Sequence, residues 1–467
     1  MTKPEGSGLT DAATALVTSL SADDLSPAAR ELVTTAILDC LGCTLAGADT
    51  PDAELAQAWV ESLGGRPEAT LLAGSGGSAP ASLAALANGV AGHALDLDDF
   101  SSTMMHPSVC LVPAVLAVGE RERATGEEVA VAYAAGFELF ARLCRGLNPG
   151  HYAAGWHATS TVGTIAAAAA AARLLRLDHE ATAIAIGIAA SSSAGIRQNF
   201  GSMVKPLHAG NAAFHGVAAA ELAARGFTAA PDALDGKAGF VSVFGGDPPA
   251  ELTPASFGRG ELELDRSGIS FKRYACCGAI HAALDATLEL RAQHGLTADE
   301  VARVRCGVNR WAPDILIHHT ASTPSQGRFC IEYSLAVALA DGDAGVRQYG
   351  DDRIADPSVQ ELASRVEVSV DDELAVGYST FPAAVAIETT SGETLSTQVD
   401  VARGNPSTPF TRAELDRKFL DCASLRLDRE SAERALAAAR DLWQLEDVGA
   451  LVAAMAGATE PSGAVTR

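Results

Sequence analysis

The hydrophobic pattern of this chain changes twice, and that change limits its possible folds more than any other feature. From Ser26-Pro27, which is typical of a helix start, apolar residues recur at helical spacing, and alanine-rich stretches such as 164–177 favour closely packed helices. After about residue 267 the period becomes two, as in residues 302–308, which predicts strands. Helical spacing returns after Gly404-Asn405-Pro406. The sequence therefore predicts a mainly α fold with a strand-containing insertion.

The simplest architecture that fits both changes is discontinuous. Residues 1–267 and 404–460 would form one large all-helical bundle domain, and residues 268–403 would form a smaller inserted α+β domain. A length of 467 residues exceeds the usual size of a single core, which also favours two units. Within the smaller unit, residues 385–389 and 395–401 alternate on either side of Ser391-Gly392 and predict a β-hairpin.

Composition is typical of a soluble globular protein. Hydrophobic residues make up 48% and charged residues 20%, and no run of about 18 apolar residues predicts a membrane span. The first residues lack the basic start and apolar stretch of a secretory signal, so we expect a cytoplasmic protein. The net charge of −24 repels phosphate, which argues against nucleic acid and membranes as partners. An anionic substrate would need a site that gathers Lys, Arg and His.

The nine cysteines are scattered and lack the paired spacing of zinc sites. We therefore expect reduced thiols. Cys40 and Cys43 imitate a C-x-x-C motif, but they occupy apolar positions of a predicted helix, which favours buried packing over redox chemistry.

The densest polar cluster runs from His93 to Ser108 in an otherwise apolar region. It holds three carboxylates and two imidazoles, which are His93, Asp96, Asp98, Asp99 and His106. We expect this segment to form a loop between flanking helices. Crowded carboxylates raise one another's pKa, which suits a general base or acid. The alternative is a solvated loop or a helix cap.

A magnesium site is a second interpretation of the same acidic run. Isoprenoid synthases are helical and hold magnesium and diphosphate with an Asp-rich motif. Such a site needs a second Asn/Ser/Glu motif, which this chain lacks, and neighbouring Asp98 and Asp99 would not share a helix face. The sequence therefore predicts no metal.

Two further clusters place basic residues beside predicted helix starts. His157 precedes an alanine-rich helix that Thr159 or Ser160 would cap, so an anionic group could bind at its positive end; a structural histidine is the alternative. Lys205 precedes a proline, which predicts extended backbone that aims the ammonium group at a carboxylate. His208 is expected to cap or orient the next helix.

A fourth cluster lies at the predicted domain junction, where basic residues could meet a ligand. Its members are Lys272, Arg273, Cys276, Cys277 and His281. The two cysteines could either line the site or pack in the core, and the sequence does not distinguish these alternatives. A weaker fifth cluster consists of Arg328, Glu332 and Tyr333.

These clusters lack nucleotide-binding glycine motifs, Ser–His–Asp nucleophile signatures and a cysteine set for an iron–sulfur cluster. What remains is acid–base chemistry with cationic anchors and no cofactor.

Four segments in a fixed order resemble the MmgE/PrpD family, which includes 2-methylcitrate dehydratase, cis-aconitate decarboxylase and iminodisuccinate epimerase. They are HALDLDD…HPS, GWHATSTVGT, MVKPLHAGNAA and FKRYACCGAIHAA, followed by RGNP before a helical tail. The resemblance covers nearly the whole chain. It implies a helical bundle with a smaller lid domain, assembled as a homodimer.

The resemblance also implies functional residues. The positions of the decarboxylase branch fall on Asp96, His106, His157, Lys205, Lys272 and Tyr333. We expect further substrate contacts from Phe100, His208, Arg273 and Cys277. Phe100 departs from that branch, which carries Thr at this position, and Ser101-Ser102 replaces its following WH. An aromatic wall therefore replaces a hydroxyl donor.

The reactions of the family share a carbanion or enolate beside a carboxylate. Lys205 and Lys272 would bind carboxylates and stabilise the developing charge, while His106 or His157 moves the proton and Asp96 tunes the imidazole. We therefore predict a cofactor-independent lyase that dehydrates or decarboxylates a small di- or tricarboxylic acid. The alternatives are an epimerase or isomerase using the same carbanion, and a catalytically silent binding protein.

Overall fold

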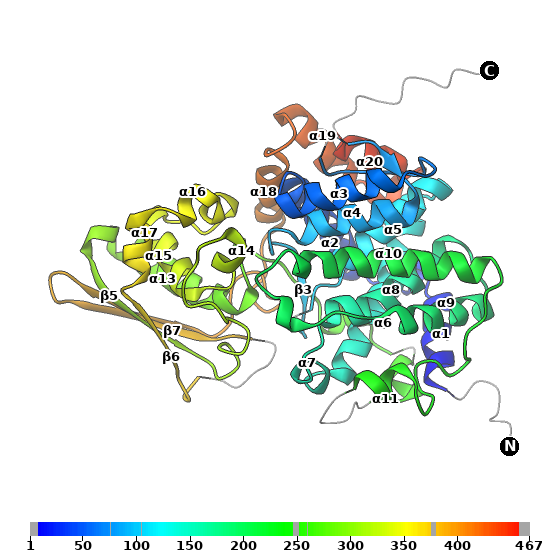
Figure 1. The fold of residues 1–467 in the computed structure, drawn as a ribbon, viewed down its shortest axis with the longest axis horizontal. Helices are drawn as coiled ribbons and strands as arrows, with labels where there is room; N and C mark the ends of the chain where they lie inside the picture. Colours follow the sequence, from blue (N-terminus) through cyan, green and yellow to red (C-terminus); the bar gives the residue numbers. More distant parts are fainter. Residues whose placement is uncertain are drawn as a thin grey trace.

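The structure is a computed structural model that describes residues 8–456 except 75, 104, 246–251, 259 and 375–379. It has two lobes, a large helical one and a smaller one that holds a sheet (Figure 1). The mainly α fold predicted from the sequence is confirmed. Among the described residues, no single helix is long and apolar enough to cross a membrane. Helices α2 (Pro27–Gly47) and α3 (Pro51–Leu63) reach that length and composition only when taken together, and the pair is bent by 90°.

The large lobe contains helices from both ends of the chain. They are α1 (Leu9–Ser19), α2 (Pro27–Gly47), α3 (Pro51–Leu63), α4 (Ala81–His93), α5 (Ser108–Glu122), α6 (Gly126–Leu147), α7 (Gly150–Ala153), α8 (Ala158–Leu174), α9 (His179–Ser192), α10 (Val204–Ala224), α11 (Phe240–Phe244), α12 (Glu263–Arg266), α18 (Arg412–Ala423), α19 (Arg429–Arg440) and α20 (Gly449–Met455). Ser26 caps α2 by accepting a hydrogen bond from the Ala29 N–H, as its sequence predicted. Helices α18 and α19 pack on α2, so the C-terminal segment completes this lobe.

Small residues let the central helices of the large lobe approach one another closely. Every residue of α8 from Ala158 to Ala172 is buried. Where α4 crosses α10, a Cβ on Gly89 would lie 2.9 Å from the Cα of Gly210. This close approach brings the C-terminal end of α4, with His93, to the N-terminal end of α10, with Lys205.

The small lobe is an α+β unit. Its helices are α13 (His281–His294), α14 (Pro324–Gly327), α15 (Ile331–Asp341), α16 (Asp351–Ile354) and α17 (Pro357–Ala363), and its strands are β5 (Val301–Val308), β6 (Val366–Val370), β7 (Ala383–Thr389) and β8 (Thr394–Val399). The sheet order is β6-β5-β7-β8, with β5 and β6 parallel and the other pairs antiparallel. The predicted hairpin is β7–β8, in which Ile387 lies opposite Leu395. Helix α13 packs on β7 and β8, and α15 packs on β6.

Two short ladders modify the prediction of an all-helical large domain. β1 (Ala69–Thr70) pairs with β2 (Ser78–Ala79), and β3 (Phe100–Ser101) pairs with β4 (Ile269–Ser270). The second ladder joins the acidic segment to the chain that enters the small lobe. Nearby, the Phe271 N–H donates to the Gly404 carbonyl at 3.0 Å, so the outgoing and returning segments lie side by side. The predicted domain boundaries, which fall beside this contact, stay predictions.

Candidate active site

The acidic segment is a buried loop. It connects α4 to α5, as its sequence predicted. Asp96, Asp98 and Asp99 are 3%, 0% and 0% exposed, which removes the alternative of a solvated surface loop. Asp96 has a φ of 50°, in the left-handed region that Asp tolerates better than most residues. This turn directs both its carboxylate and its carbonyl toward Lys272.

Two lysines from distant parts of the chain share the Asp96 carboxylate. Lys272 Nζ lies 2.7 Å from Asp96 Oδ1 and donates to the Asp96 carbonyl at 2.8 Å, and Lys205 Nζ lies 3.1 Å from the same Oδ1. Burial by itself raises the pKa of Asp96, but the two lysines hold that pKa well below its ordinary value. Burial likewise lowers the pKa of Lys272, and Asp96 outweighs it and raises that pKa. Both charged forms are therefore favoured.

The backbone at Lys205 differs from the prediction. Lys205 lies in the first turn of α10, not in an extended segment. Pro206 is compatible with this position because the first N–H groups of a helix have no intrahelical partner. The helical start places Lys205 Nζ 2.8 Å from His93 Nε2, and 5.8 and 5.5 Å from the ring centres of Phe200 and Phe329. An ionic anchor thus lies against an apolar wall.

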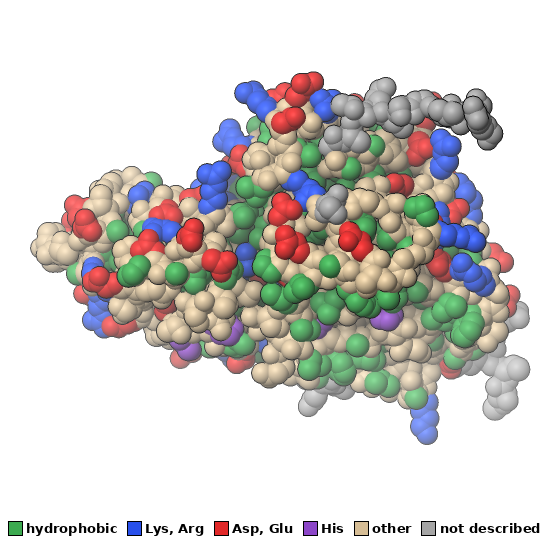
Figure 2. All heavy atoms as spheres, turned by 45° about the horizontal axis from the view of Figure 1, so that its top comes forward, with side chains coloured by type: hydrophobic (Ala, Val, Ile, Leu, Met, Phe, Trp, Pro, Cys, Tyr) green, Lys and Arg blue, Asp and Glu red, His purple; other side chains and the backbone are tan. Residues whose placement is uncertain are grey.

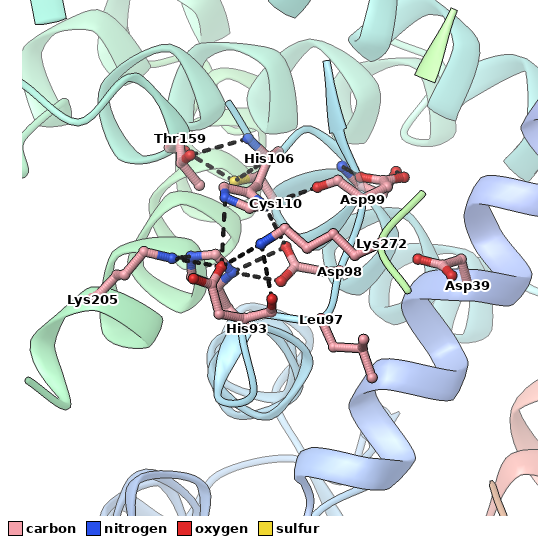
Figure 3. Close-up of polar contacts among 12 residues, drawn as sticks. Asp39, His93, Leu97, Asp98, Asp99, His106, Cys110, Thr159, Lys205 and Lys272 are labelled. Atoms are coloured by element: carbon pink, nitrogen blue, oxygen red, sulfur yellow. Dashed lines mark hydrogen bonds and ion pairs between the residues drawn. The ribbon is translucent and has the colours of Figure 1, made fainter. Parts of the chain in front are cut away.

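Asp98 fixes two imidazoles at once (Figure 3). Its carboxylate oxygens lie 2.8 and 3.0 Å from His93 Nδ1, and Oδ2 lies 3.0 Å from His106 Nδ1. His106 Nδ1 also donates to the Asp99 carbonyl at 2.8 Å. With hydrogen on each Nδ1, His93 Nε2 accepts from Lys205 and His106 Nε2 stays unprotonated. Burial lowers the pKa of His93 to about 4 and also lowers that of His106, so both are neutral at neutral pH.

The predicted tuning of His106 by Asp96 stays a prediction, and the structure adds Asp98 as a closer carboxylate partner of this imidazole. His106 Nε2 lies 3.8 Å from Asp96 Oδ1, whereas Asp98 approaches the other ring nitrogen more closely. Asp96 anchors the lysines and Asp98 orients the imidazoles. Asp98 and His93 belong to the polar cluster in the sequence, but no role was predicted for them; their five-residue separation across the end of α4 is the signal that could have found them.

The pKa of Asp99 is shifted in the opposite direction to that of Asp96. Its carboxyl accepts from Ser108 Oγ, which in turn lies 2.6 Å from the Tyr133 hydroxyl. Burial raises the pKa of Asp99 well above its ordinary value, and the neighbouring carboxylates Asp39 and Asp98 add to this. Crowding thus raises a pKa as the sequence predicted, but in a carboxyl that does not line the cavity.

His157 is itself the N-cap of α8, so the expected caps Thr159 and Ser160 lie within the first turn instead. Thr159 Oγ1 accepts from the backbone N–H of His106 at 3.2 Å. His157 Nδ1 lies 3.0 Å from His208 Nδ1, and its ring meets that of Phe200 edge-on. Burial lowers the pKa of His157 well below its ordinary value, and His208 and Lys205 lower it further. His157 is therefore a third neutral imidazole at the site, after His93 and His106.

These side chains surround a small cavity of about 40 Å³. Its lining consists of Asp96, Phe100, Met105, His106, Tyr152, His157, Phe200, Lys205, Lys272, Cys277, Gly278, Ala279, Ile315 and Phe329. Asp96 Oδ2 is buried there and finds no hydrogen-bond partner among the described residues. Burial raises the pKa of Cys277 to about 11, with Asp96 adding to the shift, so its thiol stays protonated. One polar wall thus faces one largely apolar wall.

Three predicted site residues do not line this cavity. His208 lies behind His157. Arg273 is exposed, with its guanidinium 5.2 Å from the ring centre of Tyr274. Tyr333 is buried, and its hydroxyl donates to the Gln348 carbonyl at 2.6 Å. Within the fifth cluster, Arg328 is also buried away from the lining. Direct contact of these residues with substrate stays a prediction.

A resident metal ion does not fit the donor set. His93, Asp96, Asp98 and His106 offer ligand atoms within 4.8 Å of one another. However, Lys205 Nζ already contacts His93 Nε2, and both lysines contact Asp96 Oδ1. A divalent cation here would be repelled by two ammonium groups at close range.

The chain matches known protein families and enzymes. Residues 12–253 match the MmgE/PrpD N-terminal domain and residues 274–444 the MmgE/PrpD C-terminal domain. The chain is 27% identical to the cis-aconitate decarboxylase of Homo sapiens over 437 residues, which cover 91% of this chain and 90% of that protein. Identity to the enzyme of the same name is 28% in Mus musculus, covering 81% and 79%, and 27% in Aspergillus terreus, covering 85% and 86%.

Proposed function

Because the chain belongs to the MmgE/PrpD family, we propose that it is a lyase that decarboxylates a small di- or tricarboxylic acid through a carbanion or enolate. Similarity to three cis-aconitate decarboxylases supports decarboxylation over dehydration. The observation that carries the proposal is the sharing of Asp96 by Lys205 and Lys272 at the wall of a buried cavity. Two ammonium groups share one carboxylate oxygen, and Lys205 keeps a further N–H that can bind a substrate carboxylate.

The two lysines would act on the charge that develops during the reaction. When carbon dioxide leaves, the electron pair of the broken C–C bond stays on the substrate as a carbanion, or as an enolate delocalised into a neighbouring carboxylate. Lys272 is held by two contacts to Asp96, so its ammonium group is already oriented. A preorganised donor of this kind contributes about 3–4 kcal/mol to transition-state stabilisation.

Lys205 is the best proton donor for the carbanion. The orientation of His106 leaves Nε2 as an acceptor, and the lowered pKa values of His106 and His157 disfavour imidazolium. Lys205 donates to His93 Nε2 and Asp96 Oδ1, which leaves a third N–H while its side chain lines the cavity. The proton would pass from Lys205 Nζ to the substrate carbon, and His106 Nε2 would accept a hydrogen bond from a protonated substrate group.

Phe100 bears on the choice of substrate. It lines the cavity, where the decarboxylase branch is expected to present a threonine hydroxyl. A phenylalanine ring has no N–H or O–H group, so it cannot donate a conventional hydrogen bond to a substrate carboxylate. We therefore propose that the substrate presents an apolar or smaller group at this position, so that an acid other than cis-aconitate is preferred.

The reaction can be followed by NMR in deuterated buffer, with and without chelator. The panel is 2-methylcitrate, citrate, cis-aconitate and iminodisuccinate. We expect one acid to lose carbon dioxide and gain one deuterium on the adjoining carbon, unaffected by chelator. Net loss of water would show that the enzyme is a dehydratase and not a decarboxylase. Exchange without net loss would favour the epimerase, and binding without reaction the silent binding protein.

Substitution of Lys205 by Met tests the role of the site in the same assay. The variant should lose most of the turnover, while Lys237→Met, which removes an exposed lysine, should keep it. Full turnover in both variants would reject this site. The homodimer and the cytoplasmic location stay predictions from the sequence.

A further inference from the structure

A second and much larger cavity lies between the lobes. It has a volume of about 710 Å³, within the range of about 300–1,000 Å³ that is typical of small-molecule sites. Its walls come from the loop before α16, from α18 and the segment before it, and from the chain around Leu97 and Lys272. We call it the junction cleft.

The junction cleft gathers positive charge in an acidic protein. Six basic and three acidic side chains line it, whereas the whole chain has a net charge of −24. They are Lys272, Arg273, Arg347, Arg403, Arg417 and Lys418, with Asp343, Glu414 and Asp421. Figure 2 shows Lys and Arg side chains at the junction of the two lobes. A local excess of positive charge attracts anions even though the protein as a whole is negatively charged.

Half of these cations are already engaged. Lys272 binds Asp96, Lys418 Nζ lies 2.6 Å from Asp39 Oδ1, and Arg403 pairs with Glu414 at 2.9 Å. The guanidinium groups of Arg273, Arg347 and Arg417 have no hydrogen-bond or ion-pair partner in the part of the chain that the structure describes. Three exposed arginines from three separate segments thus face one cleft with unused donors.

The junction cleft is distinct from the catalytic cavity. Lys272 lines both, but its Nζ is directed to Asp96. Leu97 lines only the cleft, and its carbonyl accepts from Lys418 at 2.9 Å. Arg347 and Arg417 line the cleft and not the catalytic cavity. The Asp96–Leu97 segment therefore separates the two spaces.

We propose that the junction cleft binds a second ligand, a small molecule with several oxyanion groups, through Arg273, Arg347 and Arg417. Guanidinium groups bind carboxylate and phosphate in the same bidentate geometry, so the ligand is a polycarboxylate or a phosphorylated compound. The volume accommodates several such groups at once. Asp343 and Asp421 also face the cleft and oppose binding, which restricts it to multivalent anions.

Calorimetric titration of the full chain tests this site with pyrophosphate and with the saturated tricarboxylate tricarballylate. The doubly substituted variant Arg347→Met with Arg417→Met should bind at least one probe about 10-fold or more weakly, because it loses charge-assisted hydrogen bonds. Both side chains are exposed and unpaired, so the fold should survive. Arg412→Met, which removes an arginine of α18 outside the cleft, should bind like the wild type.

Two further variants locate the bound probe. Lys205→Met removes a cation of the catalytic cavity and should leave binding in the cleft unchanged. Asp421→Asn should tighten binding several-fold, because it removes an opposing charge. The proposal is overturned if neither probe binds the wild type, or if binding is lost with Lys205→Met and kept with the double arginine variant. If only one of the two probes binds more weakly to the double arginine variant, that probe shows whether the ligand is a phosphorylated compound or a polycarboxylate.

Discussion

The loop between α4 and α5 carries two aspartates whose pKa values are shifted in opposite directions. Asp96 lines the catalytic cavity, contacts Lys205 and Lys272, and has a pKa well below its ordinary value. Asp99 contacts Ser108 and has a pKa well above its ordinary value. Both are buried, so desolvation raises both pKa values, but Asp96 has two lysine neighbours, whereas Asp99 has the carboxylates Asp39 and Asp98. The charge partner therefore decides which carboxylate of an acidic run is ionised.

The largest effect should come from Asp96→Asn. The variant leaves Lys205 and Lys272 buried together without their counter-charge, so we expect a loss of about 3–5 kcal/mol in the free energy of unfolding. Activity should fall by more than about 100-fold, because the lysines lose their orientation. Urea unfolding and the kcat/KM of the confirmed substrate measure the two effects. Asp99→Asn is the matched control, since the raised pKa of Asp99 favours its neutral carboxyl, which an amide resembles; equal losses in both variants would contradict the comparison.

Asp98→Asn should reduce kcat by roughly 100-fold, which is the lower end of what a positioned acid or base contributes. The amide no longer favours hydrogen on Nδ1 of both His93 and His106, so neither Nε2 is fixed as an acceptor. A purely structural role would change stability without moving the pH profile of kcat. We therefore expect a shifted profile, measured with the confirmed substrate, and an unchanged profile would remove this role.

The pH dependence of stability should separate the two aspartates. The depressed pKa of Asp96 stabilises the fold above its unfolded value near 3.8, and this contribution is lost as the pH falls below that value. The raised pKa of Asp99 has the opposite sign: stability falls as the pH rises above about 3.8, because the unfolded state releases its proton first. As the pH rises above about 3.8, Asp99→Asn should therefore lose less stability than the wild type, by about 1.4 kcal/mol for each unit of the Asp99 pKa shift. Parallel stability curves from chemical denaturation would contradict this.

The smallest effect should come from Phe100→Thr. Restoring the hydroxyl should raise the kcat/KM for cis-aconitate relative to the preferred acid by about 10-fold, the scale of a single contact in a binding pocket. Competition between the two acids in one reaction measures the ratio. Phe227→Thr alters an exposed phenylalanine and should leave the ratio unchanged. An unchanged ratio in both variants would show that Phe100 does not determine which acid is preferred.

Local patterns predicted most of the elements. The start of α2 at Ser26-Pro27, the hairpin β7–β8 and the loop that carries Asp96 and His106 all appear where the sequence indicated. Each of these depends on residues that are neighbours in the chain. The start of α10 was missed, because the constraint of Pro206 on extended backbone also fits the first turn of a helix.

Partnerships across the chain were harder to predict. The five-residue separation of His93 and Asp98 is visible in the sequence, but nothing local says that Asp98 also reaches His106 or that His93 meets Lys205. The ladder β3–β4 consists of two residues on each side, too short for a periodic signal. The sequence also left undecided whether the acidic loop is exposed to solvent, and the structure shows that it is buried.

The sequence by itself determined the residue types available for chemistry, the mainly α fold and the insertion of a strand-containing unit, because these follow from composition and local periodicity. Only the tertiary structure decided that Lys205 and Lys272 share Asp96, that Asp98 orients two imidazoles and that the pKa of Asp99 is raised. The physical reason is that burial and charge partners set each pKa, and both are properties of residues brought together from 109 and 176 positions away. Asp96 and Asp99 lie three positions apart, yet those distant contacts give them opposite roles.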